Sequence, residues 1–224
     1  MKEKSKKEHI HINHFNPDVT SLEKAHQDFP LQIQKFNAGD EFENFNEFIL
    51  EEAMEYTEEG NGVTYVVWNV LNEEETANPQ REVVAFYTLA ATAIPYEDRI
   101  RLDVKEADLY GREFDSEICG IPALEIKLFA VDEKYQNVFY EFEGEDLPVS
   151  AWIMRSIISY ADSLMHEVLG FKALFLHALP NAEHFYEVNG FNPMRINMQP
   201  LHSVDSEYTA MYLALRDVHM NYDE

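Results

Sequence analysis

Hydrophobic positions along the chain follow two different periods, and the changes between them mark the expected elements. Apolar residues at every second position predict a half-buried strand, whereas apolar residues three or four positions apart predict one face of a helix. Residues 31–36 (LQIQKF) alternate and predict a strand. The aromatic and aliphatic positions that follow predict a helix from Asp40, as its N-cap, to about Tyr56.

The rest of the chain continues the same mixture of strands and helices. The remaining expected elements are strands at 63–69, 82–94 and 124–132, a long helix from 147–148 to Gly170, a buried strand at 173–179, a short helix at 180–189 and a last strand at 208–215. The strands at 63–69 and 82–94 are expected to pair with each other across the polar loop 71–81. Residues 95–122 show no clean period, so we expect a long connection there, with room for a short helix.

This order predicts one α/β (α+β) domain in which a mixed central sheet carries helices on both faces. Residues 1–30 lack the periodicity, so the expected organisation is a polar N-terminal arm at 1–30 followed by a single domain at 31–224.

Composition places the chain among soluble proteins. With 46% hydrophobic residues, a substantial core is available, and the only cysteine, Cys119, excludes an intrachain disulfide and fits a reducing compartment. No run approaches the 18 apolar residues of a membrane span, and no apolar segment follows the lysine-rich start as in a signal peptide. We therefore expect a cytoplasmic protein without a membrane partner.

The formal charge of −25 is the strongest compositional signal. Because nucleic-acid binding requires clustered lysine and arginine, this charge predicts no nucleic-acid partner. It favours a cationic acceptor, either a small molecule or a protein amine, by electrostatic steering. The alternative is that the acidic surface serves solubility alone.

Several short pieces occur in an order that resembles the GNAT N-acetyltransferase superfamily, over roughly residues 31–215. They are FAVD at 129–132, Tyr135-Gln136, the long helix, the buried strand and HFYEVNGF at 184–191. The resemblance implies a mostly antiparallel central sheet, and acetyl-CoA bound beside the strand at 124–132. Residues 37–40 and 85–87 also resemble the toxin-type branch of acetyltransferases, although the acidic charge argues against a tRNA-directed toxin.

The resemblance also implies a set of cofactor contacts. Pantetheine would hydrogen-bond to the backbone of Phe129, Ala130 and Val131, and the pyrophosphate loop would begin at Gln136. However, NVFY at 137–140 replaces the glycines of that loop, and four acidic residues follow it at 141–146. One alternative is that the amides of Val149, Ser150 and Ala151 bind the phosphates, because helix N-termini attract anions. The other is that CoA binding has been lost. Asn181 is either a CoA contact or an ordinary N-cap.

Two side chains are the candidate catalytic groups. By family position, Tyr186 would protonate the departing thiolate, and the alternative is that it only packs against the sheet. Glu125 is the candidate base, because a carboxylate in a central strand needs a partner or a cleft. The alternative is that Lys127 pairs with Glu125. His177 and His184 are interpreted as core or rim residues.

These observations predict an N-acetyltransferase that moves an acetyl group from acetyl-CoA to an amine. The alternative is a catalytically inactive binding or regulatory protein on the same scaffold. No metal is expected, since the N-terminal histidines lack further ligands at metal-site spacing. The acceptor is not predicted, and neither is the oligomeric state, for which a homodimer is one option.

Overall fold

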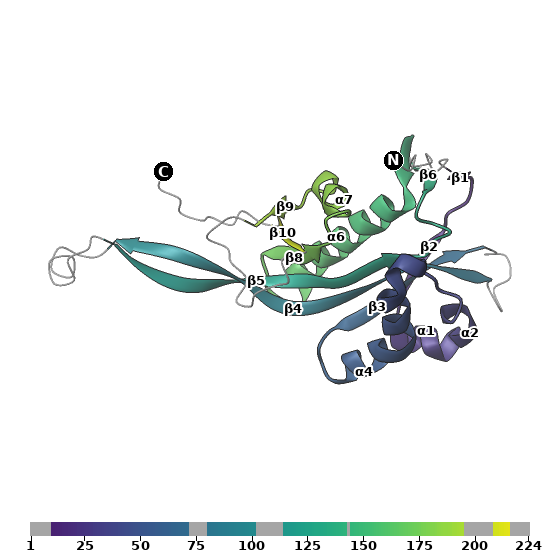
Figure 1. Cartoon of the computed structure of the whole chain (residues 1–224), viewed down its shortest axis with the longest axis horizontal. Coiled ribbons are helices and arrows are strands. Elements are labelled where there is room, and N and C mark those ends of the chain that lie inside the picture. The colour runs from purple at the N-terminus through teal and green to yellow at the C-terminus, as the bar shows by residue number, and fades with distance from the viewer. Residues whose placement is uncertain (1–9, 72–79, 102–113, 143, 195–207, 216–224) are drawn as a thin grey trace. The chain divides into compact units, whose positions relative to one another are not determined.

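The structure is a computed structural model that describes residues 10–71, 80–101, 114–142, 144–194 and 208–215 (Figure 1). The chain forms two compact units, Met1–Ala90 with Ile126–Ser159 (unit 1) and Ala91–Glu125 with Tyr160–Glu224 (unit 2). Three elements contribute residues to both units: β4 (Arg81–Arg101), β5 (Phe114–Val131) and α6 (Val149–Glu167).

The strands form one seven-stranded sheet with the order β2-β3-β4-β5-β8-β10-β9. Besides β4 and β5, this sheet contains β2 (Pro17–Ser21), β3 (Val63–Val70), β8 (Ala173–Ala178), β9 (Asn192–Pro193) and β10 (Thr209–Ala214). The pairs β2–β3, β3–β4, β8–β10 and β9–β10 are antiparallel. This confirms the predicted mixed, mostly antiparallel sheet.

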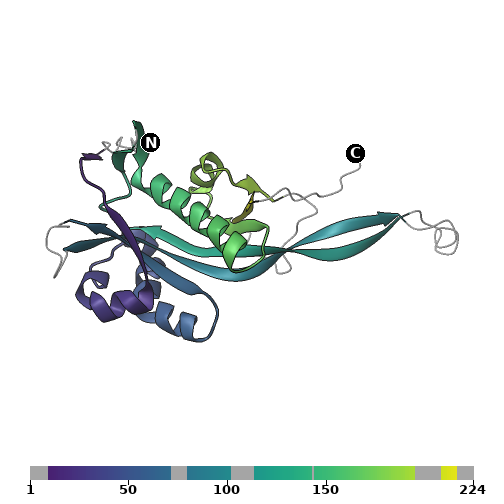
Figure 2. The ribbon, with the colours of Figure 1, turned by 180° about the vertical axis from the view of Figure 1, so that it is seen from behind.

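In unit 1, helices cover both faces of the sheet. One face carries the helical elements that precede β3, and the first turns of α6 lie on the opposite face (Figure 2). The elements before β3 are α1 (Leu22–Asp28), α2 (Pro30–Ile33), η1 (Asp40–Phe42), α3 (Glu43–Glu47), the π-helical segment η2 (Phe48–Glu52) and α4 (Ala53–Glu58). The core beneath them includes Leu22, Ile33, Ile49, Trp68 and Phe86.

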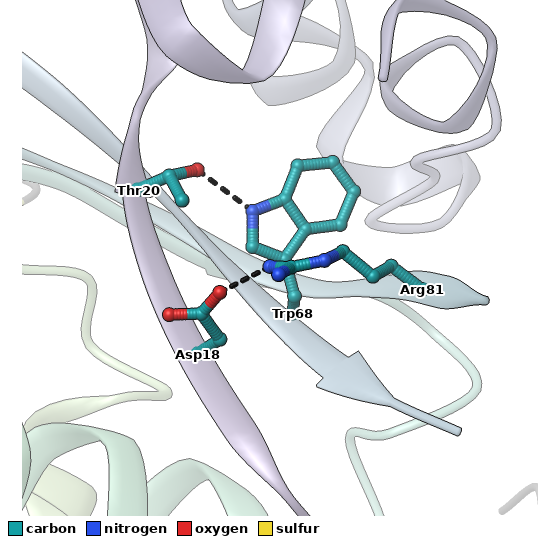
Figure 3. A network of polar contacts seen from close by, with 4 residues as sticks. All are labelled: Asp18, Thr20, Trp68 and Arg81. Atoms are coloured by element: carbon teal, nitrogen blue, oxygen red, sulfur yellow. Dashed lines mark hydrogen bonds and ion pairs between the residues drawn. The ribbon is translucent and has the colours of Figure 1, made fainter. Parts of the chain in front are cut away.

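A polar network ties the edge strand β2 to β3 and β4 (Figure 3). The Trp68 indole N–H donates to the Thr20 hydroxyl at 2.8 Å, and the Arg81 guanidinium bonds the Asp18 carboxylate. The guanidinium also lies over the Phe29 ring, 4.9 Å from its centroid. Because these side chains come from β2, β3, β4 and the α1–α2 junction, the network holds those elements in one register.

The predicted strand at 31–36 is wrong, because α2 occupies its first half. Pro30 is the first residue of α2, where its fixed φ and missing N–H suit a helix start. Ile33 and Phe36 are both buried, and they lie three positions apart, as on one face of a helical turn. Over six residues, that spacing and strict alternation look alike.

The predicted helix at 40–56 is confirmed as the run of short helical segments from Asp40 to Glu58. Its start differs, because Asp40 lies inside the first turn and Gly39 occupies the N-cap position with φ 101°. That left-handed backbone favours glycine.

The expected irregular connection at 95–122 is wrong for residues 95–101 and 114–122, and residues 102–113 lie outside the described residues. Strand β4 continues to Arg101 and β5 begins at Phe114, so the described parts of this stretch are extended (Figure 1). Near the start of β5, the adjacent residues Glu117 and Ile118, which point to opposite faces of the strand, are both exposed. A ribbon exposed on both faces needs no apolar alternation, which explains why the period failed to mark it.

Two smaller features complete the fold. A second sheet in unit 1 has the order β1-β6-β7, formed by β1 (Ile10–Ile12), β6 (Val138–Phe142) and β7 (Glu145–Pro148). Unit 2 also contains α7 (Glu183–Val188), and its core cluster includes Ile94, Ile121, Phe175 and Tyr212. No helix in the described part of the chain is long and apolar enough to cross a membrane.

Substitutions at two neighbouring aliphatic residues test α2. In a strand, Leu31 and Ile33 would share one face, whereas in α2 the Leu31 residue is 68% exposed and Ile33 is 0% exposed. Ile33→Ala should lower the free energy of unfolding by about 2–5 kcal/mol, and Leu31→Ala should change it by less than about 0.5 kcal/mol. Urea denaturation measures both, and equal losses would contradict the helix.

Candidate functional site

The end of strand β5 is held by a buried carboxylate in unit 1. Asp132 is 2% exposed and accepts hydrogen bonds from the backbone N–H groups of Asn37 and Lys134, both at 3.0 Å. In return, the Glu133 N–H donates to the Asn37 carbonyl at 2.8 Å. A carboxylate that accepts two amide hydrogen bonds is a charge-assisted anchor. It fixes the loop before η1 against the loop after β5.

The Gln136 side chain strengthens the same junction. Its amide nitrogen donates to the Ala38 carbonyl at 2.8 Å and to the Val131 carbonyl at 3.0 Å. Both amide hydrogens are therefore used within the protein, and the amide oxygen is the group left for a ligand. The predicted role of Gln136 at a pyrophosphate stays a prediction, while its contacts give it a structural role.

In the stretch where the resemblance places the phosphate loop, β6 and β7 pair as an antiparallel hairpin. Strand β1 pairs with β6 in parallel, with the Ile10 N–H donating to the Asn137 carbonyl at 3.1 Å. On the hairpin, Glu145 lies 3.2 Å from the Arg155 guanidinium and Asp146 lies 3.4 Å from His11 Nδ1. Two of the acidic residues of this stretch thus have cationic or titratable neighbours that offset their charge.

The hairpin leads directly into the first turn of α6. That turn holds Val149, which is buried, and Ser150 and Ala151, which are half-buried, and it contains no acidic residue. A helix of 19 residues carries a positive dipole end here. These amides are the part of unit 1 best suited to an anionic group.

The three predicted pantetheine contacts lie on the last residues of β5. Ala130 and Val131 are buried and Phe129 is half-buried. Past the strand end, the Asp132 N–H donates to the Val84 carbonyl at 2.8 Å, which keeps β5 paired with β4. A role of these three residues in cofactor binding remains a prediction.

In unit 2, the structure places Glu125 beside a histidine. Glu125 is 5% exposed, and its Oε1 lies 3.5 Å from His177 Nδ1 on β8. Lys127, the partner considered from sequence, has an exposed side chain. Sequence reasoning missed this pairing, although a histidine inside an otherwise apolar strand was a usable signal.

Tyr186 lies on α7 and is 9% exposed. Its ring meets those of Phe185 and Phe191 edge-to-face, with centroids 5.2 and 5.8 Å away. Burial raises the pKa of the Tyr186 hydroxyl to about 12. Asn181 is exposed and precedes α7, but the N-cap position belongs to Ala182, so the ordinary N-cap alternative for Asn181 is wrong.

A further buried network in unit 1 was not predicted. The Tyr135 hydroxyl donates to Glu82 at 2.9 Å, and Asn69 lies 3.5 Å from the same oxygen. Burial, with a further contribution from Glu82, raises the pKa of Tyr135 to about 12 against the opposing effect of Asn69. Within the described residues, no group of three or more histidine, cysteine or acidic side chains could hold a metal ion.

Comparison with known proteins places the fold. No family model and no curated protein matches the sequence. A tyrosine-to-phenylalanine variant of the AtaT toxin matches with TM-score 0.57 and 18% identity, over 92% of this chain and 95% of that one. AtaTR bound with AcCoA matches with TM-score 0.56 and 18% identity, over 89% and 93%. AtaT complexed with acetyl-methionyl-tRNAfMet matches with TM-score 0.55 and 20% identity, over 89% and 95%. These matches confirm the GNAT-like fold.

The same comparison corrects the exclusion of nucleic acid. AtaT, which shares this fold, is seen in complex with an acylated tRNA, so neither that exclusion nor the argument against a tRNA-directed toxin stands. The physical reason is that net charge sums over the whole chain, whereas phosphate contacts depend on local clusters of cations. In this chain, residues 1–7 carry four lysines and one glutamate.

The two buried tyrosines provide a titration test. In the folded protein Tyr135 and Tyr186 should ionise near pH 12, and Tyr135→Phe and Tyr186→Phe should each remove one late-ionising tyrosine from the phenolate absorbance titration. Below pH 10, Tyr186 is protonated in both folded and unfolded chains. Between pH 10 and 12 only the unfolded chain has lost that proton, so stability falls as pH rises, by about 1.4 kcal/mol per pH unit for each tyrosine.

Urea denaturation across pH 10–12 checks this slope, which should become shallower in either variant. If Tyr186→Phe removes no late-ionising tyrosine from the titration, the burial of the Tyr186 hydroxyl is contradicted.

Proposed function

We propose that the chain is an acetyl-CoA-dependent N-acetyltransferase that acts on the α-amine of an aminoacyl-tRNA. The observation that carries the proposal is the fold match over about nine-tenths of the chain to proteins captured with AcCoA and with acetyl-methionyl-tRNAfMet. The cofactor strand, the α6 N-terminus and the tyrosine on α7 all occur in this chain in the expected order.

The cofactor phosphates are assigned to the start of α6. The amides of Val149, Ser150 and Ala151 open a long helix whose dipole favours an anion, and no carboxylate stands in that turn. The Arg155 guanidinium beside Glu145 reduces the repulsion from the hairpin. This arrangement replaces a glycine-rich loop by a rigid hairpin that leads into the helix.

Tyr186 is assigned as the general acid. A hydroxyl whose pKa burial raises to about 12 is fully protonated at neutral pH, so its proton is always available. Thioester cleavage produces a thiolate, and the same apolar surroundings that raise the pKa of the phenol also raise that of a thiol. The proton therefore moves only as the carbon–sulfur bond breaks.

A second candidate function follows from one specific observation. The hairpin β6–β7 occupies the stretch where glycines would let the backbone approach a pyrophosphate, which favours a scaffold that binds a partner without using CoA. Calorimetry with acetyl-CoA separates the two candidates. Saturable binding supports the transferase, and the absence of heat at high concentration supports the binding protein.

Substitution of Tyr186 tests the acid. With acetyl-CoA and methionyl-tRNA as substrates, Tyr186→Phe should lower kcat by about 10²–10⁴-fold and leave the KM for acetyl-CoA nearly unchanged, because only proton transfer is lost. Tyr160→Phe, at an exposed tyrosine on α6, is the control and should retain full activity. An unchanged kcat in the Tyr186 variant would remove the acid role.

Substitution of Ser150 tests the phosphate site. Ser150→Asp puts a carboxylate into the first turn of α6, which stabilises the free helix by about 0.3–1 kcal/mol but repels phosphate. We expect affinity for acetyl-CoA to fall by about tenfold or more, equivalent to about 1.4 kcal/mol, without loss of thermal stability. Ser150→Asn is the isosteric neutral control. Equal affinity in the two variants would place the phosphates elsewhere.

A further inference from the structure

On two strands of unit 2, β5 and β8, the row of apolar side chains that faces the core is followed by a polar residue. On β5, Ile121 and Ala123 face the core cluster, and Glu125 is the next residue on that side. On β8, Ala173 and Phe175 face the same cluster, and His177 is the next. Because side chains on one face recur every second residue, Glu125 and His177 extend two apolar rows. Both polar side chains lie at the boundary of the core.

A carboxylate in such a place needs a compensating group. Burial of an ionised carboxylate is strongly unfavourable unless it is paired, and the His177 imidazole lies 3.5 Å from Glu125 Oε1. A carboxylate beside Nδ1 favours the tautomer that carries its proton there. The other ring nitrogen, Nε2, then presents a lone pair.

The second ring nitrogen is not used by the part of the chain that the structure describes. His177 Nε2 is buried from solvent and has no hydrogen-bond partner among the described residues. A buried polar atom left without a partner is unfavourable by about 1–3 kcal/mol, so such atoms usually mark a function or a bound molecule. The neighbours that the structure gives this ring are Glu125 on β5, Phe175 on its own strand at 4.8 Å between centroids, and Ala210 opposite it on β10. The side chains of Phe175 and Ala210 can neither donate a hydrogen bond to Nε2 nor accept one from it.

We propose that His177 Nε2 is the base that deprotonates the acceptor amine, and that Glu125 is a positioning residue that acts through His177. The proposal rests on the transferase function proposed above and changes the assignment of the base made from sequence. Glu125, almost fully buried and facing His177, holds and stabilises the imidazole. A histidine is the side chain whose ordinary pKa suits proton removal near neutral pH.

The proton balance of the step is complete. His177 Nε2 takes one proton from the acceptor ammonium, and the neutral amine adds to the thioester carbonyl carbon, forming the carbon–nitrogen bond. The carbon–sulfur bond then breaks, and the thiolate receives the Tyr186 proton. The protonated amide nitrogen of the adduct loses its extra proton to the tyrosinate. One proton remains on His177 and leaves to solvent, which matches an ammonium and a thioester becoming an amide, a thiol and a proton.

The test is the pH dependence of acetyl transfer from acetyl-CoA to methionyl-tRNA. His177→Gln should lower kcat by about 10²–10⁴-fold and abolish the acid limb of the kcat profile. Glu125→Gln should lower kcat less and move the limb to lower pH, because the imidazolium loses its neighbouring negative charge. A purely structural pair would lower stability in both variants without moving the limb.

The chain offers a matched control in an exposed imidazole–carboxylate pair. His166 Nδ1 lies 3.6 Å from Asp162 on α6, and both side chains are exposed. His166→Gln should leave rate and pH profile unchanged. Full activity with an intact acid limb in His177→Gln overturns the proposal, as does a limb that disappears in Glu125→Gln but persists in His177→Gln.

Two measurements on the unmodified protein keep the test decisive if a variant fails to fold. Nitrogen NMR of the imidazoles should show His177 protonated at Nδ1 and not at Nε2 above neutral pH, and the opposite tautomer overturns the proposal. Calorimetry with acetyl-CoA tests the transferase function separately from the assignment of His177 as the base. No binding overturns the transferase function together with the base, whereas binding by a protein whose His177 carries its proton on Nε2 overturns the base alone.

Discussion

The structure of unit 1 depends on one carboxylate at the end of β5. Asp132 accepts two backbone amide hydrogen bonds from positions 37 and 134, and charge-assisted bonds of this kind contribute about 1.5–3 kcal/mol each. Through them, the chain before η1 is fixed to the chain after the central strand, although nearly one hundred residues separate them. Gln136 then bridges the same two segments by donating to one carbonyl on each side. The strand end, the loop at 37–39 and the start of the hairpin therefore have one common geometry.

That constraint explains why the stretch after β5 tolerates the loss of its glycines. A flexible phosphate loop needs glycine because its backbone must approach the ligand closely. Here the chain leaves the Asp132 junction and enters a paired hairpin, so its amides and carbonyls are used in the β6–β7 and β1–β6 ladders. The amides left for an anion are then those at the helix start, where the chain can no longer pair with a strand. The acidic residues that made the sequence look hostile to phosphate lie on the hairpin, two of them beside His11 and Arg155.

Sequence periodicity was sufficient for the long, strongly patterned elements and insufficient elsewhere. The strands containing residues 63–69, 82–94 and 124–131 and the helix α6 were predictable because burial on one face imposes a period on many residues. Residues 31–36 were not, since one turn of helix and a short strand share the same apolar spacing. The hairpin at 138–148 was hidden by its acidic, exposed positions. For the candidate site, order along the chain located Tyr186 and Glu125, but the partner of Glu125 lies on another strand, and only the pairing of β5 with β8 brings it there.

The prediction from net charge, that the chain has no nucleic-acid partner, was wrong for a related reason. A formal charge of −25 describes the whole chain, but a phosphate responds mainly to the few groups within about 8 Å at physiological salt. Burial acts on the same local scale. Tyr186 holds its proton because its surroundings are apolar, and the buried Glu125 carboxylate lies beside an imidazole. Two groups of unit 2 are thereby biased in opposite directions, one to keep a proton and the other to stabilise an imidazole that has taken one. An acid and a base with separate proton affinities are what transfer from a thioester to an amine requires, and the local environments, not the net charge, create that separation.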